Sequence, residues 1–153
     1  MKAASLSKRF ATRSAVHLWH DESMNSGAST RTNVGPFTVI DHVQLAMPPG
    51  EEHVARNFYC EVLGMREIVK PAELARRGGC WFESGNVQIH LGVEADFRPA
   101  KKAHPALRCA DYDDLISRLR THNVAVDEPN DIPEVKRGHF HDCFGNRIEV
   151  IAD

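Results

Sequence analysis

Residues 84–91 read Ser-Gly-Asn-Val-Gln-Ile-His-Leu, and residues 144–151 read Phe-Gly-Asn-Arg-Ile-Glu-Val-Ile. In each stretch a Gly-Asn pair, which is a signal for a tight turn between two strands, precedes an alternation of polar and apolar residues that is typical of a half-buried strand. The Gly-Asn pairs lie 60 residues apart, and Ile89 and Ile148 then match at an offset of 59. The chain therefore contains two related hairpins.

The repeat extends upstream of the hairpins, and its members occur in the same order in both halves. The offset drifts only from 62 to 59 along the way. The matched pairs are His42 with His104, Leu45 with Leu107, Val54 with Leu115, Phe58 with Leu119, and His90 with Glu149. A single match would carry little weight, but ordered matches indicate a duplicated module and a pseudo-two-fold axis.

The pattern of each half predicts the same order of elements. In the first half we expect a strand at 38–47, a helix at 51–63 with acidic residues in its first turn, and strands at 65–70, 79–83 and 87–93. In the second half we expect a strand at 104–110, a helix at 113–122, and strands at 124–126, 138–142 and 147–151. The fold class is α+β, with two tandem β-α-β-β-β modules whose curved mixed sheets enclose a cavity for a metal ion or ligand.

The domain boundaries follow from composition. Residues 1–36 combine a basic, acid-free start with a Ser/Asn/Gly/Thr-rich stretch, so we expect a disordered N-terminal extension. Residues 37–153 form one domain, with module one at 37–95, a linker at 96–103 and module two at 104–153.

Bulk composition excludes several classes of partner. The net charge is −2 and no apolar run is long enough to span a bilayer, so we expect neither nucleic-acid binding nor membrane insertion. The four cysteines have no Cys-x-x-Cys spacing and are expected to be reduced thiols. These features predict a cytoplasmic protein with a small-molecule ligand.

Strand alternation separates an apolar face from an unusually polar one. In the first half Val43 and Leu45 lie opposite His42 and Gln44, and the second half repeats this division. A solvated sheet face would mostly carry Lys, Thr, Glu and Ser. Histidines and a glutamate at duplicated positions instead indicate a metal centre built from distant residues, with the expected ligands His42, His90, His104 and Glu149.

Several segments also resemble a known family. Residues 40–45, 57–65, 104–107 and 142–149 are similar to the vicinal oxygen chelate superfamily, which includes glyoxalase I, extradiol dioxygenases and bleomycin-resistance proteins. The resemblance places metal ligands on the first and last strands of each module, which are the positions of the same four residues. It also implies a catalytic role for Glu149. Glyoxalase I has a glutamate where this chain has His90, a departure that argues against glyoxalase activity.

Three imidazoles and a carboxylate suit one divalent metal ion per site, with Zn, Ni, Fe, Co and Mn as the candidates. Four ligands of an octahedral ion leave two neighbouring positions for a substrate that chelates through vicinal oxygens, where the ion acts as a Lewis acid. If His90 does not bind, the remaining ligands form a two-histidine, one-carboxylate triad of the kind used by non-haem iron oxygenases. Candidate substrate-binding residues on the same faces or beside them are Gln44, Trp81, Gln88, Arg108, His139, His141 and Arg147.

The sequence is compatible with two functions of different classes, an enzyme and a binding protein. The first is a metal-dependent lyase, isomerase or dioxygenase acting on a small vicinal-oxygen substrate. The alternative is a metal-free ligand-sequestering protein of the bleomycin-resistance type. We also expect a homodimer, because two short modules have little surface with which to cover two open sheets.

Overall fold

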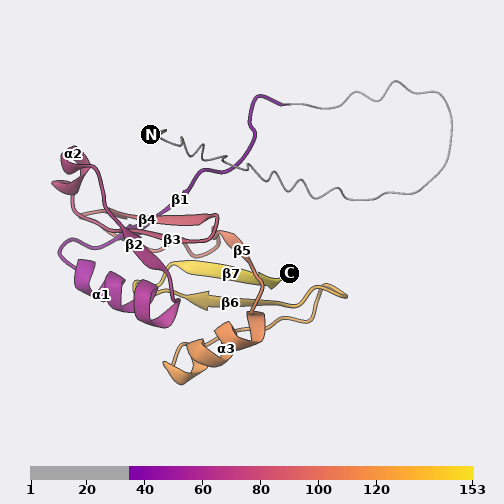
Figure 1. Cartoon of the computed structure of the whole chain (residues 1–153). Helices are drawn as coiled ribbons and strands as arrows, with labels where there is room; N and C mark the ends of the chain where they lie inside the picture. The colour runs from indigo at the N-terminus through magenta and orange to yellow at the C-terminus, as the bar shows by residue number, and fades with distance from the viewer. Residues whose placement is uncertain (1–34) are drawn as a thin grey trace, which may run out of the picture. The chain divides into compact units, whose positions relative to one another are not determined.

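A computed structural model describes residues 35–153. The chain divides into residues 1–37 and the unit Thr38–Asp153, and all of the elements below belong to the second unit. The expected N-terminal extension lies almost entirely outside the described residues. Seven strands form two sheets, and in Figure 1 the short helix α2 (Ala72–Ala75) lies at the top, whereas α1 (Glu52–Arg56) and α3 (Tyr112–Thr121) lie lower.

Module one forms a four-stranded mixed sheet, here called sheet A, in the order β1-β4-β3-β2. β1 runs parallel to β4, whereas the other neighbours are antiparallel. The elements of this module are β1 (Val43–Met47), α1 (Glu52–Arg56), the π-helix η1 (Asn57–Val62), β2 (Arg66–Ile68), α2 (Ala72–Ala75), β3 (Trp81–Ser84) and β4 (Val87–Val93).

Module two forms a three-stranded sheet, sheet B, in the order β5-β7-β6. β5 is parallel to β7, and β6 is antiparallel to it, so the sheet repeats the pairing of the first three strands of sheet A. The elements are β5 (Ala106–Cys109), α3 (Tyr112–Thr121), β6 (Arg137–His141) and β7 (Arg147–Ala152). This arrangement confirms the predicted duplication.

The prediction of the elements needs three corrections. The first strand begins at Val43 and not at residue 38, because its pairing with β4 starts at Val43 and Ile89, and in this register β4 has no residue opposite positions before 41. The strand predicted at 124–126 does not form; the chain there makes only an isolated bridge between Asp127 and His139. The short helix α2 was not predicted, since four residues are too few to show a helical period.

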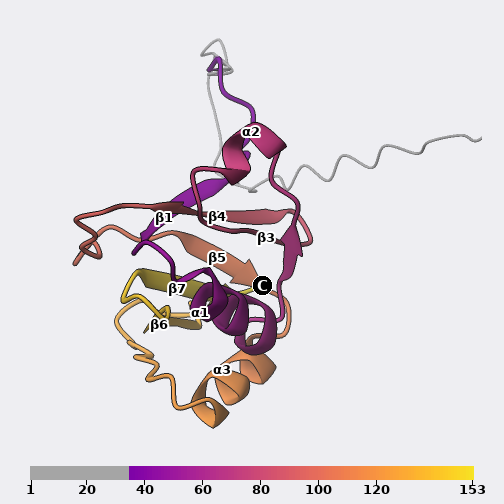
Figure 2. The same cartoon turned by 90° about the vertical axis from the view of Figure 1, so that its left-hand side faces the viewer.

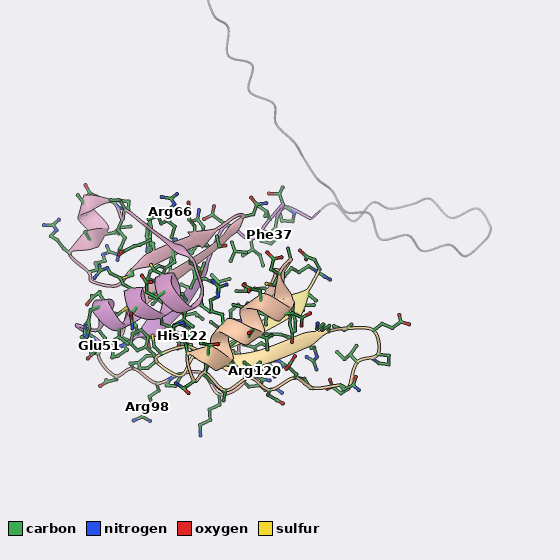
Figure 3. The ribbon with its side chains drawn as sticks, turned by 60° about the horizontal axis from the view of Figure 1, so that its bottom comes forward. Phe37, Glu51, Arg66, Arg98, Arg120 and His122 are labelled. Carbon is green, nitrogen blue, oxygen red and sulfur yellow. The ribbon has the colours of Figure 1, made fainter. Side chains whose placement is uncertain are left out.

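One continuous core joins the modules. Figures 1 and 2 show sheet A above sheet B. In Figure 1 α1 lies below sheet A and α3 lies below sheet B, and both helices come to the front in Figure 3. Apolar side chains of both sheets and of the helices meet in this core, including Ile89 of β4, Ile148 of β7 and Leu119 of α3. The apolar faces are thereby used for packing, which leaves the polar faces for function.

The turn between β6 and β7 fixes the modules to each other. Asp142 accepts hydrogen bonds from the backbone amides of Phe144 and Asn146, while Gly145 adopts the positive φ of 87° that this turn requires. The Asn146 amide also donates to the carbonyl oxygen of Ala46 in β1 at 2.8 Å. Tyr59 of η1 donates to the second Asp142 oxygen at 2.8 Å, and both side chains are buried.

No helix among the described residues is long and apolar enough to cross a membrane. All four cysteines are free thiols, as their spacing predicted.

Candidate metal centre

Three side chains of types that commonly bind metal ions lie together on the polar face of sheet B. Glu149 lies in the middle of the central strand β7, and His139 of β6 is its direct cross-strand partner. His104 comes just before β5, whose residue Ala106 pairs with Glu149 from the other side. The central strand therefore presents its carboxylate between two histidines, and all three side chains are largely buried.

The arrangement of His104 and Glu149 favours a cation between their side chains. The Nδ1–H of His104 donates to the carbonyl oxygen of Lys102 at 2.7 Å, because a carbonyl can only accept. In the neutral imidazole the other nitrogen, Nε2, then has a lone pair, and it lies 3.2 Å from Oε2 of Glu149. Two acceptors at this distance repel each other unless a proton or a metal ion lies between them.

The second oxygen of Glu149 is already occupied. Oε1 accepts a hydrogen bond from Nη1 of Arg137 at 2.8 Å, and Nη2 of Arg137 donates to Asp131 at 2.7 Å. Burial opposes ionisation of Glu149, but the hydrogen bond from Arg137 is the first of the causes that lower the pKa of this carboxyl, which lies below its usual value. Glu149 is thus an ionised carboxylate that offers Oε2.

His139 has no hydrogen bond on either ring nitrogen within the described part of the chain. Its side chain is only 7% exposed, its Nδ1 is buried without a partner, and its Nε2 lies 3.7 Å from Oε1 of Glu149, beyond hydrogen-bond distance. Burial, with the charge of Arg147 as the next cause, lowers the pKa of His139. The ring is therefore kept neutral, which is the form that binds metals.

His104, His139 and Glu149 form the group of metal-type donors found among residues 35–153. One ligand atom of each lies within 4.8 Å of the others. Two imidazoles and one carboxylate are a donor set that divalent transition metals accept, so the residues fit the ion that the sequence predicted.

The polar face of sheet A is built differently. His90 of β4 is sandwiched between two rings: Trp81, its cross-strand partner in β3, stacks on one side with centroids 4.0 Å apart, and His42 stacks at 4.0 Å as well. The Nδ1–H of His42 donates to Asp41 at 2.7 Å. Module one therefore presents a stack of three rings and no carboxylate donor comparable to Glu149.

The expected convergence of four ligands does not occur within one chain. His42 and His90 are together on sheet A, and His104 and Glu149 are together on sheet B, but the three-donor group contains no residue of sheet A. The repeat predicts equivalent positions correctly, yet equivalence alone does not place the polar faces against each other, since the core uses the apolar faces to join the modules.

His90 nevertheless has properties of a ligand that lacks its ion. Its Nε2 is buried without a partner, and burial, followed by the proximity of His42, lowers its pKa. The ring is neutral and its nitrogen is unsatisfied, which is costly unless something binds it.

The other predicted ligand-binding residues are spread over both faces. The Gln44 amide lies across Gly92, where a Cβ would approach it to 2.7 Å. Arg108 is exposed and donates to the carbonyl oxygen of Ala152. His141 is exposed, whereas Arg147 is half-buried near His139.

A cavity of about 210 Å³ lies between the modules beside the ring stack. Its lining includes His42 and Gln88 from module one and Pro105, Ala106 and Leu107 from module two. Among the four expected metal ligands, His42 is therefore the one that lines this cavity.

Sequence reasoning missed Arg137 and Asp131. Arg137 is separated from Glu149 by 12 residues and reaches it only through the antiparallel pairing of β6 with β7. Strand alternation offered a signal for Arg137, because it shares a face with His139 two residues later. Asp131 precedes the strand and carried no periodic signal.

Comparisons with known proteins agree with this fold. The family model of the Glyoxalase/Bleomycin resistance protein/Dioxygenase superfamily matches residues 39–150. Among curated proteins, none matches the chain.

Solved structures share the fold over most of this chain. A glyoxalase family protein from Bacillus anthracis is 47% identical, with a TM-score of 0.75, covering 78% of this chain and 98% of that one. An antibiotic binding protein from a Streptomyces species is 24% identical, with a TM-score of 0.57 and coverage of 76% and 98%. The fosfomycin resistance protein of Listeria monocytogenes is 15% identical, with a TM-score of 0.60 and coverage of 76% and 94%. The last two similarities concern the fold alone.

Proposed function

Because the chain belongs to the Glyoxalase/Bleomycin resistance protein/Dioxygenase superfamily, we propose that it is a metal-dependent enzyme acting on a small substrate with oxygens on adjacent atoms. The reaction class is that of a lyase, an isomerase or a dioxygenase. The observation that carries the proposal is the 3.2 Å approach of His104 Nε2 to Glu149 Oε2, with Nδ1–H already committed to a carbonyl.

The residues of this chain have distinct tasks in such a site. His104 and Glu149 hold the ion, and Arg137 fixes the carboxylate so that one oxygen points to the ion. A divalent ion bound there would supply Lewis-acid stabilisation of negative charge on a chelating substrate. Glu149 is the one carboxylate of the donor group, so it is also the group that would take a proton from the substrate.

His42 and His90 belong to the proposed ligand set as well, and they would join it from a second copy of the chain. A symmetric homodimer would place the ring stack of one copy opposite Glu149 of the other. Exposed apolar side chains next to β1 favour such a partner, since Val39 is 82% exposed and Ile40 is 76% exposed.

The direct test is metal analysis of protein purified without a histidine tag. We expect about one zinc, nickel, iron, cobalt or manganese ion per chain, and no more than a trace in the Glu149→Gln variant. Protein that binds none of these ions on titration would contradict the enzyme proposal.

The ring stack favours a second function, a metal-free protein that sequesters a flat aromatic ligand. His90 and Trp81 are nearly parallel, at 5°, and Lys70 lies over the indole ring at 5.8 Å from its centroid. Ligand binding in this case would persist in EDTA and would be lost in Trp81→Ala. The enzyme proposal requires the opposite response to EDTA.

A further inference from the structure

His139 is a buried histidine that is not among the four metal ligands expected from the sequence. It stands on β6 beside Glu149, its side chain is 7% exposed, and neither ring nitrogen has a hydrogen-bond partner among the described residues. Buried imidazoles normally satisfy at least one nitrogen, because an unpartnered polar atom away from water is destabilising. The unpartnered ring is therefore available to bind a group that is not part of the polypeptide.

We propose that His104, His139 and Glu149 of a single chain form a two-histidine, one-carboxylate metal site, with His139 as the third ligand. The inference rests on the proposed function in one respect, because both place an ion between His104 and Glu149. It differs in the origin of the remaining donor, which comes from the same module and requires no second copy.

The geometry of the three side chains fits one ion. Their ligand atoms lie within 4.8 Å of one another before any adjustment to a metal, and the two rings meet edge to face with centroids 5.2 Å apart. The rings therefore do not stack, unlike the rings of His42 and His90 at an interplanar angle of 19°. Donors this close together could be brought to one ion by rotation of the side chains.

The positive charge beside Glu149 is offset by a second carboxylate. Arg137 is the cation in direct contact with Glu149, and it is itself paired with Asp131, which offsets its charge. Arg137 also occupies Oε1, so Glu149 is directed to bind through Oε2 alone. This outer contact is of the kind that fixes the ligands in metal sites of other proteins.

Three ligands on one side of an octahedral ion leave three adjacent positions open. A bidentate substrate takes two of them, and a further small molecule such as water or dioxygen can take the third. Of the candidate ions, ferrous iron is the one most typical of this donor set. The single-chain triad therefore moves the expected chemistry towards oxygen-dependent reactions.

The experiment is Co²⁺ titration of untagged, EDTA-treated full-length protein, followed by visible absorption. We compare wild type with His139→Phe and His139→Gln, and with the double variant His42→Ala/His90→Ala. His141→Gln is the matched control, because His141 lies on the same strand and face but is exposed. Circular dichroism and the melting temperature of the metal-free forms establish that each variant is folded.

The triad predicts that both His139 variants bind Co²⁺ at least about 100-fold more weakly, since even residues behind the ligands change affinity 10- to 100-fold. The control and the double variant should stay within about threefold of wild type. Loss of binding in the double variant with normal binding in the His139 variants would overturn the triad and leave the four-ligand enzyme proposal standing. Absence of binding in wild type would overturn both.

A measurement on wild type alone makes the test independent of variant folding. In the proton NMR spectrum of the Co²⁺ protein, each coordinated imidazole with a protonated second nitrogen gives one strongly shifted N–H signal. The triad predicts two such signals, and the four-ligand set with three histidines predicts three. A count of three would contradict the triad.

Discussion

His139 occupies in module two the position that Trp81 occupies in module one. Trp81 pairs across the strands with His90, and His139 pairs with Glu149, while His90 and Glu149 are themselves matched by the repeat. An indole ring that stacks on its partner in one half is thus replaced by an imidazole ring in the donor group of the other. The duplicated sheets have diverged into a stacking face and a donor face.

Replacing Glu149 by Gln should abolish metal binding. The amide is neutral and a weak ligand, so we expect a loss of affinity of at least about 100-fold, above the effect of residues that only support ligands. Arg137 would also lose a carboxylate partner, which should lower the melting temperature slightly. Inductively coupled plasma mass spectrometry measures the metal. The control is Glu83→Gln on sheet A, which makes the same change of charge in a glutamate that is also paired with an arginine, Arg66. Unchanged stoichiometry in Glu149→Gln would remove this residue from the site.

Replacing Arg137 by Gln should shift the pH profile of metal binding. The hydrogen bond from Arg137 lowers the pKa of Glu149, so its removal raises that pKa and lets protons compete with the ion at higher pH. Binding measured from pH 4 to 8 should therefore fail at a higher pH than in wild type. Arg108→Gln, on the same face but bonded only to a carbonyl, should leave the profile in place.

Lowering the pH should destabilise the metal-free protein in part through His90. Burial keeps the folded-state pKa of His90 below its ordinary value of 6.5, so the unfolded chain takes up a proton that the folded chain resists. Stability from this residue is complete above pH 6.5 and is lost as the pH falls through the folded-state pKa. Urea unfolding at pH 7.5 and 5 should show a smaller loss in His90→Phe than in wild type. Equal losses would show that His90 is protonated as easily in the fold as in the unfolded chain.

Replacing Asn146 by Ala should weaken the junction between the modules. The side-chain amide donates to Ala46 and to Asp142, and the variant loses both hydrogen bonds, at a cost of about 1–3 kcal/mol. Thermal unfolding measures this cost. Asn86→Ala changes the matched turn of module one, where the residue is exposed, and should have little effect.

If the protein is a homodimer, light scattering at micromolar concentration should give a mass of about twice 17.1 kDa. Replacing Ile40, which is 76% exposed, by Lys would place a charge in the interface and should shift the equilibrium to monomers. Glu73→Lys, in the short helix α2, introduces the same side chain as a control. A monomeric wild type that still binds one ion would favour the single-chain triad.

Periodicity predicted most of the fold because both sheets have one buried face. The alternation around Ile89 and Ile148 identified β4 and β7, and the spacing of Leu115 and Leu119 identified α3. It failed at 124–126, where a three-residue β-rich run lacks a partner strand. Pairing is a property of two segments, and one segment cannot reveal it.

The candidate site was predictable only within each module. His104 and Glu149 could be matched through the repeat, and the structure places them 3.2 Å apart. The sequence analysis predicted His139 as a substrate-binding residue and not as a metal ligand, because the repeat matches no histidine to it in module one. Strand alternation could place Arg137 on the same face as His139, but only the register of β6 and β7 brings Arg137 to Glu149.

The buried contact between Tyr59 and Asp142 has a consequence for folding. Tyr59 belongs to the π-helix of module one and Asp142 to the turn of module two, 83 residues further along the chain. Separation of the halves would break this hydrogen bond and the one from Asn146 to Ala46, and it would expose apolar side chains of the shared core to water. The two halves of this duplicated chain should therefore melt in a single cooperative transition. A fragment containing only one half should not fold stably by itself.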